Sequence, residues 1–181
     1  AMASIDVCAW PLRANAPAVS PDGKSLACVV GSDGTLNLFT LNVDGTHARQ
    51  LTSYSHGEQV YNPKWSPDGK TILFDYSIKD GRDIAMVAVG GGEVTPVLAT
   101  GQDERNAVFT PDGSKLIFSS DKSGVFNLYQ YDLTTKQSVQ LTNVLGGAFM
   151  PTMNLSGQLV FASYTSAGYK IAMIDSIRPL A

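Results

Sequence analysis

Short apolar runs alternate with polar turns along almost the whole chain. Four of these runs follow similar turns, at residues 26–30, 72–74, 116–118 and 159–161. They are rich in the β-branched and aromatic residues that favour strands. No ten-residue window keeps the i, i+3, i+4, i+7 apolar stripe of an amphipathic helix. The pattern therefore predicts an all-β protein.

The turn that precedes each run is a repeated phrase. Pro-Asp-Gly stands at 21–23, 67–69 and 111–113, and a divergent Leu-Ser-Gly stands at 155–157, so the steps are 46, 44 and 44 residues. Proline presets φ, aspartate accepts backbone hydrogen bonds, and glycine tolerates a positive φ. We therefore expect a positive φ at Gly69. A period near 45 with several strands per repeat is typical of propeller blades.

Each repeat holds further strand signals. A second loop ends in glycine at 34, 81, 124 and 168, and a third strand follows it. A fourth segment ends in Leu-Thr or a similar pair in the first three repeats. The prediction is a β-propeller of four four-stranded blades, at about 16–60, 61–105, 106–148 and 149–181. Trp65 and Phe109, which precede their turns, are expected to be buried between neighbouring blades.

The remaining residues, 1–15, raise the question of ring closure. Ala1-Met2-Ala3 is typical of residues left by cloning, and residues 5–10 alternate in a way compatible with a ring-closing strand. A propeller has to cover its strand edges. Three arrangements stay open: a closed four-bladed ring, half of a ring completed by self-association with a second copy, or a fragment of a propeller with six to eight blades.

Composition limits the partners. The chain has 181 residues, 44% of them hydrophobic, and a net charge of -3 with 13 scattered Lys and Arg. Without a basic stripe, nucleic acid is not expected as a partner. No apolar run approaches the roughly 18 residues of a membrane span. Cys8 and Cys28 lack the spacing of a zinc site, so we expect buried thiols, with a bridge between them as the alternative.

No catalytic, cofactor or metal site is predicted. There is no Gly-x-Ser-x-Gly elbow for a serine nucleophile. His47 and His56 are expected on opposite faces of the propeller, where they cannot form a relay. Asp33, Asp80 and Asp121 recur in the second loops, but each loop offers too few carboxylates for a calcium site. We therefore expect a protein that is not an enzyme.

The candidate binding residues lie in the loops that connect one blade to the next. Function tends to gather on loops held by a rigid scaffold, and aromatic residues and arginine are typical of binding hot spots. The connectors, 52–62, 100–106 and 142–150, carry Tyr54, His56, Glu58, Tyr61, Asp103, Glu104, Arg105 and Phe149. They predict a surface for a protein or peptide at the mouth of the central channel.

The repeat resembles a known family. Ser-Pro-Asp-Gly-Lys at 20–24 and 66–70, followed by Gly-x-x-Asn-Leu and Leu-Thr motifs, is similar to the WD-like propeller repeat of the TolB family over about residues 17–175. The resemblance implies a non-enzymatic binding propeller of the bacterial periplasm or cell envelope, with a Pal-like lipoprotein partner by analogy.

Two departures qualify the resemblance. Proteins of the family carry an α/β domain before a six-bladed propeller, whereas this sequence shows four blades and no such domain. The same repeat also occurs in the propeller domains of some peptidases. The alternative function is therefore an accessory propeller of a larger hydrolase or lyase, of the peptidase or polysaccharide-degrading type.

Overall fold

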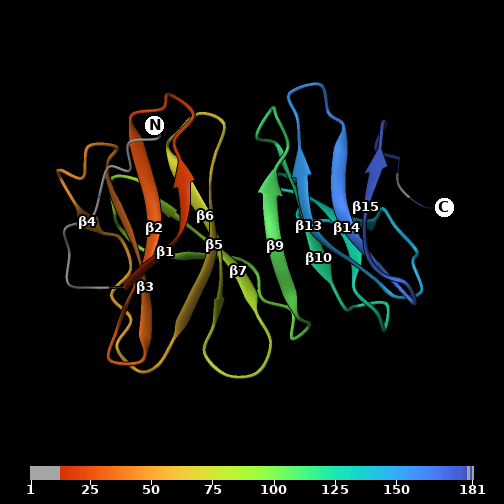
Figure 1. Ribbon diagram of the computed structural model, residues 1–181, viewed down its shortest axis with the longest axis horizontal. Coiled ribbons are helices and arrows are strands. Elements are labelled where there is room, and N and C mark those ends of the chain that lie inside the picture. The colour runs from red at the N-terminus through yellow and green to blue at the C-terminus, as the bar shows by residue number, and fades with distance from the viewer. Residues whose placement is uncertain (1–12, 179, 181) are drawn as a thin grey trace.

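The computed structural model describes residues 13–178 and 180 and is built from antiparallel strands (Figure 1). No helix occurs among these residues, which confirms the predicted all-β class. The predicted strand at residues 5–10, and with it Cys8, lies outside the described residues. Cys28 is buried in β2.

The strands form four sheets, called blades 1 to 4, in which strand order follows the chain. Blade 1 contains β1 (Arg13–Val19), β2 (Ser25–Ser32), β3 (Thr35–Asn42) and β4 (Arg49–Gln50). Blade 2 contains β5 (Gln59–Trp65), β6 (Thr71–Ser77), β7 (Asp83–Ala88) and β8 (Thr95–Leu98). Blade 3 contains β9 (Glu104–Phe109), β10 (Lys115–Ser120), β11 (Asn127–Asp132) and β12 (Ser138–Gln140). Blade 4 contains β13 (Gly147–Met153), β14 (Leu159–Thr165) and β15 (Gly168–Ile174).

Blade 4 therefore has three strands where four were predicted. The described residues beyond β15 form no strand. Instead, Ile177 packs against the core between blades 3 and 4, and the Leu180 N–H donates to the Gln140 carbonyl oxygen on β12 at 3.0 Å. The end of the described chain thus contacts the preceding blade. It does not extend the sheet of blade 4, in which β15 is an edge strand.

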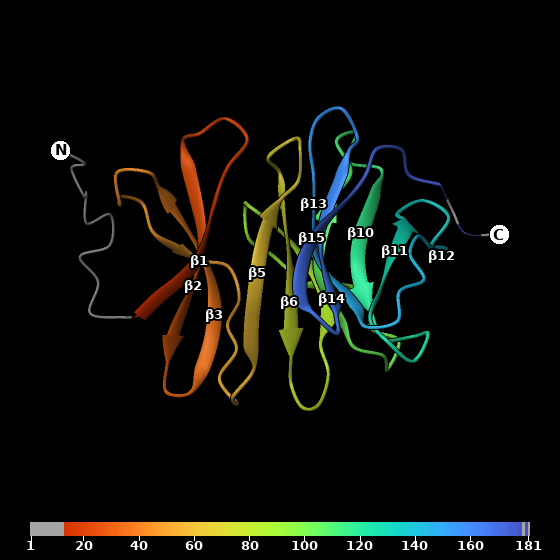
Figure 2. The same ribbon diagram turned by 45° about the vertical axis from the view of Figure 1, so that its right-hand side comes forward.

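The first strands of successive blades lie next to one another. β1 contacts β5, β5 contacts β9, and β9 contacts β13. Figures 1 and 2 show the four sheets following each other in chain order, with the Pro-Asp-Gly turns at one end and the connectors at the other. We call these ends the turn face and the connector face.

Apolar clusters between consecutive blades form the core. The face of each blade that looks towards the next blade in the chain is called its forward face, and the opposite face its rear face. Leu38, Ile84 and Leu128 occupy the same position on the forward faces of blades 1, 2 and 3, and all are 0% exposed. Each belongs to a cluster shared with the following blade. Burial between sheets is what joins the blades.

Trp65 and Phe109 pack against the apolar clusters between neighbouring blades, where burial was predicted, but both are only partly buried. Both pack at the rim of a blade interface, where part of each ring lines a cavity on the turn face. The Trp65 indole N–H donates to the Ala18 carbonyl oxygen of blade 1 at 2.9 Å. A tryptophan at this rim can satisfy its polar edge while its ring contacts the neighbouring blade.

Every first strand carries a β-bulge that the sequence pattern did not predict. The bulges contain Ala16, Asn62, Asn106 and Met150, whose φ angles are 49°, 50°, 58° and 53°. A bulge bends the strand and increases its twist. Its recurrence at the same place in four blades makes it part of the repeat.

The described blades do not form a closed four-bladed ring. Closure would bury the forward face of blade 4 against blade 1, yet Ile171 on that face is 79% exposed. One of the three arrangements compatible with the sequence is thereby excluded for the described residues.

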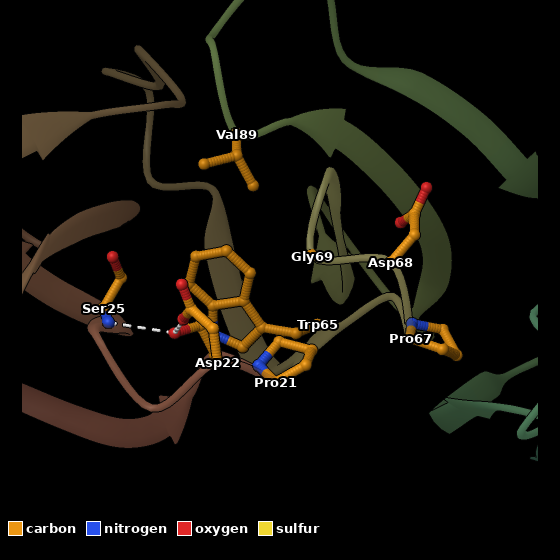
Figure 3. Close-up of a pocket in the computed structure, with 9 residues that line it drawn as sticks. Pro21, Asp22, Ser25, Trp65, Pro67, Asp68, Gly69 and Val89 are labelled. Atoms are coloured by element: carbon orange, nitrogen blue, oxygen red, sulfur yellow. Dashed lines mark hydrogen bonds between the residues drawn. The ribbon is translucent and has the colours of Figure 1, made fainter.

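The turns have the predicted chemistry. The Ser66 hydroxyl donates to Asp68 at 2.6 Å, the Gly69 N–H donates to the Ser66 carbonyl oxygen at 2.9 Å, and Gly69 has a φ of 69°. Figure 3 shows this turn beside the equivalent turn of blade 1. In the third turn, hydrogen bonding from Thr110, with further hydrogen bonds from Ser114, lowers the pKa of Asp112 to about 2. The turn aspartates therefore act as ionised acceptors.

Replacing Gly69 by valine tests the turn. The nearest atom to a Cβ at Gly69 is Pro21 Cδ at 3.8 Å, so the cost comes from the positive φ and not from a clash. We expect Gly69→Val to lower the free energy of unfolding by about 1–3 kcal/mol in urea denaturation. Gly90→Ala is the control, because Gly90 has no left-handed φ and no atom within 4 Å of a Cβ. Equal stability of both variants would contradict the turn geometry.

Candidate functional site

The first connector loop is anchored by an asparagine and a threonine. The Asn37 side-chain oxygen accepts hydrogen bonds from the Thr52 hydroxyl and the Tyr54 N–H, both at 2.8 Å. The Asn37 amide donates to the Tyr54 carbonyl oxygen at 2.9 Å. These bonds fix the point at which the chain leaves blade 1. The repeated Asn-Leu and Leu-Thr motifs thus have a physical role in positioning the connector.

Blade 3 repeats this anchor. Asn127 accepts hydrogen bonds from the Thr142 hydroxyl and the Val144 N–H, both at 2.9 Å. The Leu128 N–H donates to the Thr142 hydroxyl oxygen at 2.8 Å. The connector that leads to Phe149 is therefore held in the same way as the connector that carries Tyr54.

Blade 2 uses a different anchor. Asp83 occupies the asparagine position, and the Thr100 hydroxyl bonds to Glu104. Glu104 is 2% exposed, and its second carboxyl oxygen has no hydrogen-bond partner among the described residues. Burial raises the pKa of Glu104. The predicted binding residue Glu104 is thus an interior anchor of the second connector.

Three of the predicted residues, Tyr61, Arg105 and Phe149, occupy the same position on β5, β9 and β13. The Arg105 guanidinium lies 4.5 Å from the ring centroid of Phe126, which is 5.0 Å from that of Phe149. The Phe126–Phe149 contact joins blade 3 to blade 4. The structure therefore brings Arg105 and Phe149 together through an aromatic ring between them.

The stack continues across blade 4. The Phe149 and Tyr169 centroids are 6.3 Å apart, and those of Tyr169 and Tyr164 are 4.9 Å apart. We call the five residues the arginine–aromatic ladder: Arg105, Phe126, Phe149, Tyr169 and Tyr164. It runs along the connector end of blades 3 and 4 and offers rings and a guanidinium to solvent.

An aspartate orients Arg105. The Arg105 Nε donates to Asp103 Oδ1 at 2.9 Å, and Nη2 makes a second bond to the same carboxylate. The Asp103 N–H donates to Asp121 at 3.0 Å. A guanidinium held by two parallel bonds keeps one orientation. Asp103 thus serves to preorganise Arg105 at the end of the ladder.

Tyr61 lies in a separate pair. The Arg82 guanidinium lies 3.9 Å from the Tyr61 ring centroid. Arg82 Nη1 is also 3.8 Å from Asp75, a fully buried carboxylate on β6. The Arg82 guanidinium therefore contacts both an apolar ring, that of Tyr61, and a buried carboxylate, that of Asp75.

Asp75 also links blade 2 to blade 3. Its carboxylate accepts a hydrogen bond from the Asn62 amide at 2.7 Å. Its two oxygens lie 3.0 and 2.9 Å from the Asn106 N–H at the bulge of β9. Burial raises the pKa of Asp75 to about 6, against the lowering effect of these bonds and of Arg82. The equivalent residues of the other blades are Val29, Ser119 and Ala162.

The remaining predicted residues lie in the first connector. Tyr54 is half-buried against the core of blades 1 and 2, and burial raises its pKa to about 12. The His56 side chain is 87% exposed, and its backbone N–H donates to Glu58 at 2.7 Å. Tyr54 therefore serves packing, while His56 remains accessible. His47 lies in the β3–β4 loop on the turn face, opposite His56 as expected.

The turn face has cavities of its own. One of about 430 Å³ lies between the turns of blades 1 and 2, lined by Pro21, Trp65 and Val89 (Figure 3). Another of about 480 Å³ occupies the same place between blades 2 and 3. A third of about 480 Å³ lies where the four first strands end. Because the first two recur with the repeat, blade geometry accounts for them.

Among the described residues, no three His, Cys, Asp or Glu side chains gather as metal ligands would. The carboxylate of Asp121, one of the recurring loop aspartates, accepts a hydrogen bond from the Asp103 N–H. In the part of the chain that the structure describes, no helix has the length and apolarity to cross a bilayer.

Sequence reasoning missed Asp75, Arg82, Phe126, Tyr164 and Tyr169. A charged residue inside the apolar run of β6 was the available signal for Asp75. Arg82 and Phe126 closely follow the glycines of the second loops, which were not searched for site residues as the connectors were. The ring contacts themselves depend on blade packing, which no local pattern reports.

Comparison with known proteins decides the family. The model of the TolB beta propeller domain family matches residues 3–177. The chain belongs to this family. It is 27% identical to the uncharacterized peptidase YuxL of Bacillus subtilis (strain 168), over 60% of this chain and 22% of YuxL.

Two solved structures share the propeller fold. The putative TolB from Agrobacterium tumefaciens superposes with a TM-score of 0.79 at 21% identity, covering 92% of this chain and 64% of that one. A puromycin-hydrolyzing peptidase from Mycobacterium tuberculosis superposes with a TM-score of 0.73 at 16% identity, covering 93% and 29%. Such identities show the fold alone. This TolB-type chain spans less than two thirds of the length of each relative.

The buried carboxylate of Asp75 predicts a pH dependence. A raised pKa means that the folded state binds a proton more tightly than the unfolded state between about pH 4 and 6. The stability that Asp75 contributes is therefore fully present below about pH 4 and lost as the pH rises through about 6. We expect the wild type to gain about 2–3 kcal/mol relative to Asp75→Asn as the pH falls from 7 to 4. Urea denaturation of both proteins measures this, and a constant difference would contradict it.

Proposed function

We propose that this TolB-type propeller is a non-enzymatic module that binds a protein or peptide segment on its connector face. The observation that carries the proposal is the arginine–aromatic ladder, which crosses from blade 3 to blade 4. Arginine and aromatic residues are the types most enriched at binding hot spots. Arg105 and Phe149 lie on the first strands of blades 3 and 4, and Phe126 lies in the β10–β11 loop. The two tyrosines lie on β14 and β15.

Preorganisation supports this assignment. Asp103 holds Arg105 in one orientation, and Asn127 with Thr142 anchors the connector that precedes Phe149. Side chains that are ordered before binding lose less conformational entropy when a partner arrives. Tyr169, 66% exposed, offers a ring and a hydroxyl at the outer end. A segment with aromatic, aliphatic or acidic side chains suits this surface.

The setting that we propose is the periplasm or another part of the cell envelope. It rests on membership of the TolB propeller family and on the similarity to the Agrobacterium TolB structure. A Pal-like lipoprotein is the partner suggested by the family resemblance. The proposed setting and the proposed partner both refer to the whole protein, and in this proposal the propeller is the part that binds.

A second candidate function is an accessory propeller of a larger peptidase. The observation in its favour is the similarity to YuxL and to the Mycobacterium tuberculosis peptidase. In that case the catalytic residues lie in another part of the polypeptide. The two candidates differ in whether the connector face holds a separate partner.

Substitutions in the ladder test the binding function. Wild-type protein is used to capture a partner from cell-envelope extract, and the affinity for that purified partner is then measured by calorimetry. We expect Arg105→Ala and Phe149→Ala each to weaken binding about 30-fold or more, as hot-spot truncations do. The control is His47→Ala on the turn face, which should change the affinity by less than about threefold. Circular dichroism checks that all variants stay folded.

The outcomes separate the candidates. Loss of binding in His47→Ala with retention in the ladder variants would place the site on the turn face. If no partner is captured and the full-length polypeptide hydrolyses peptides, the accessory-domain function holds instead.

A further inference from the structure

A small cavity lies between blades 2 and 3, beside the connector that joins them. Its volume is about 200 Å³. The walls come from the end of β8, from the connector and from the rear face of blade 3. The apolar walls are Leu98, Phe118 and Tyr129, and the polar walls include Thr100, Glu104 and Ser120. Gln102 and Lys122, which are exposed, also line the cavity and mark where it opens to solvent.

Glu104 brings a buried carboxyl oxygen without a partner to this cavity. One of its oxygens, Oε1, accepts a hydrogen bond from the Thr100 hydroxyl. The other, Oε2, has no hydrogen-bond partner among the described residues, although Glu104 is only 2% exposed. Within residues 13–178, no ion pair joins Glu104 to a cationic side chain. A buried carboxylate is costly unless it is paired, so a donor from a ligand would be strongly favoured at Oε2.

The other blades show that the repeat does not require a carboxylate here. Glu104 and Ser120 lie opposite each other on β9 and β10. The equivalent pair in blade 2 is Val60 and Tyr76, an apolar residue and a ring. Blade 3 therefore has a charge in place of an apolar side chain and a small hydroxyl in place of a ring. These two differences supply the charge and the space of the cavity.

The surroundings of Glu104 are negative. Burial, followed by the charges of Asp83 and Asp121, raises the pKa of Glu104 against the lowering effect of hydrogen bonds from Thr100. Like charges disfavour the ionised carboxylate, and a cation beside it has the opposite effect. Lys122 lines the opening of the cavity but makes no ion pair with Glu104. The electrostatics thus favour a ligand with a positive charge.

We propose that this cavity binds an alkylammonium group, such as the side chain of a lysine. An ammonium group has three N–H donors and no acceptor. It would donate to Glu104 Oε2 and to the hydroxyl oxygens of the polar walls. The rings of Phe118 and Tyr129, whose centroids are 5.8 Å apart, offer apolar surface to the methylene groups behind the charge.

Other ligand classes fit this cavity less well. A guanidinium binds a carboxylate best through two parallel bonds, but Thr100 already bonds to Oε1 of Glu104. Calcium takes six to eight oxygen ligands, and no three His, Cys, Asp or Glu side chains gather as metal ligands among the described residues. Pockets for drug-sized ligands measure roughly 300–1,000 Å³, which is larger than this cavity. A short chain that ends in one ammonium group therefore fits best.

The cavity is separate from the arginine–aromatic ladder. Glu104 and Arg105 are neighbours on β9, so their side chains point to opposite faces of the sheet. The Glu104 side chain lies on the rear face of blade 3, with Ser120, whereas Arg105 lies opposite Ser119. The inference therefore does not rest on the proposed function of the ladder. The ammonium group has two possible sources, a lysine of a bound polypeptide or a free amine.

NMR titration of the isotope-labelled 181-residue chain tests the proposal. The probes are n-butylammonium chloride, for a free amine, and acetyl-Gly-Lys-Gly-amide, for a lysine side chain. We expect saturable shifts of the amides near Glu104 and Ser120. The dissociation constant for n-butylammonium should be on the order of 1 mM, because a ligand of few atoms gains little binding free energy. The uncharged analogue n-butanol should bind at least about tenfold more weakly.

Two variants show whether Glu104 and the cavity bind the probes. Glu104→Gln should weaken binding about tenfold or more, because it removes the charge and keeps the shape. Its matched control is Glu93→Gln, which makes the same change of charge at an exposed residue of the β7–β8 loop and should leave the affinity unchanged. The double variant Glu104→Val, Ser120→Tyr reproduces the pair found in blade 2 and should abolish binding. Circular dichroism checks that each variant is folded.

The outcomes decide the proposal. Tighter binding of the lysine peptide than of n-butylammonium indicates a polypeptide as the source, and the reverse indicates a free amine; both support an alkylammonium site. Absence of binding by either probe overturns the proposal, as does an affinity that Glu104→Gln or the filled cavity leaves unchanged. Calcium chloride that shifts the same amides and displaces n-butylammonium shows a metal site instead. None of these results affects the test of the ladder, which uses Arg105 and Phe149.

Discussion

Packing of each blade on the next is the interaction on which the rest of this structure depends. Blades 1 to 4 are sheets of three or four short strands, and the apolar faces between them leave water only because one sheet packs on the next. Leu38, Ile84 and Leu128 show how the chain meets this constraint, since each is fully buried against the following sheet. Local hydrogen bonds then fix the conformations of turns and connectors within the arrangement of blades that apolar packing determines.

The candidate site is a consequence of this stacking. The Phe126–Phe149 contact exists only because blade 4 packs on blade 3. Asp75 accepts the Asn106 N–H only because blade 3 packs on blade 2. A change at a blade interface is therefore expected to move binding residues that it does not touch. Scaffold and site are coupled through shared contacts between neighbouring sheets.

The repeat made most of the fold predictable, because turn chemistry is local. The Pro-Asp-Gly sequence predicts the backbone angles of its own turn, and Gly69 has the expected positive φ. The side-chain contacts of the candidate site were less predictable, because the residues that contact one another come from different blades. Arg105 was recognisable as a candidate, but Phe126 was not, since its role depends on contact between blades 3 and 4. Glu104, equally conspicuous in the sequence, is buried as an anchor of its loop.

The most direct test compares alanine substitutions at equivalent positions of two blades. Leu128→Ala removes a buried side chain between blades 3 and 4, and should lower the free energy of unfolding by about 2–5 kcal/mol. Ile171→Ala removes the equivalent side chain from the open face of blade 4, and should change that free energy by less than about 0.5 kcal/mol in dilute protein. Urea denaturation of the two variants measures the difference. Equal losses would contradict the account that packing between successive blades holds this propeller together.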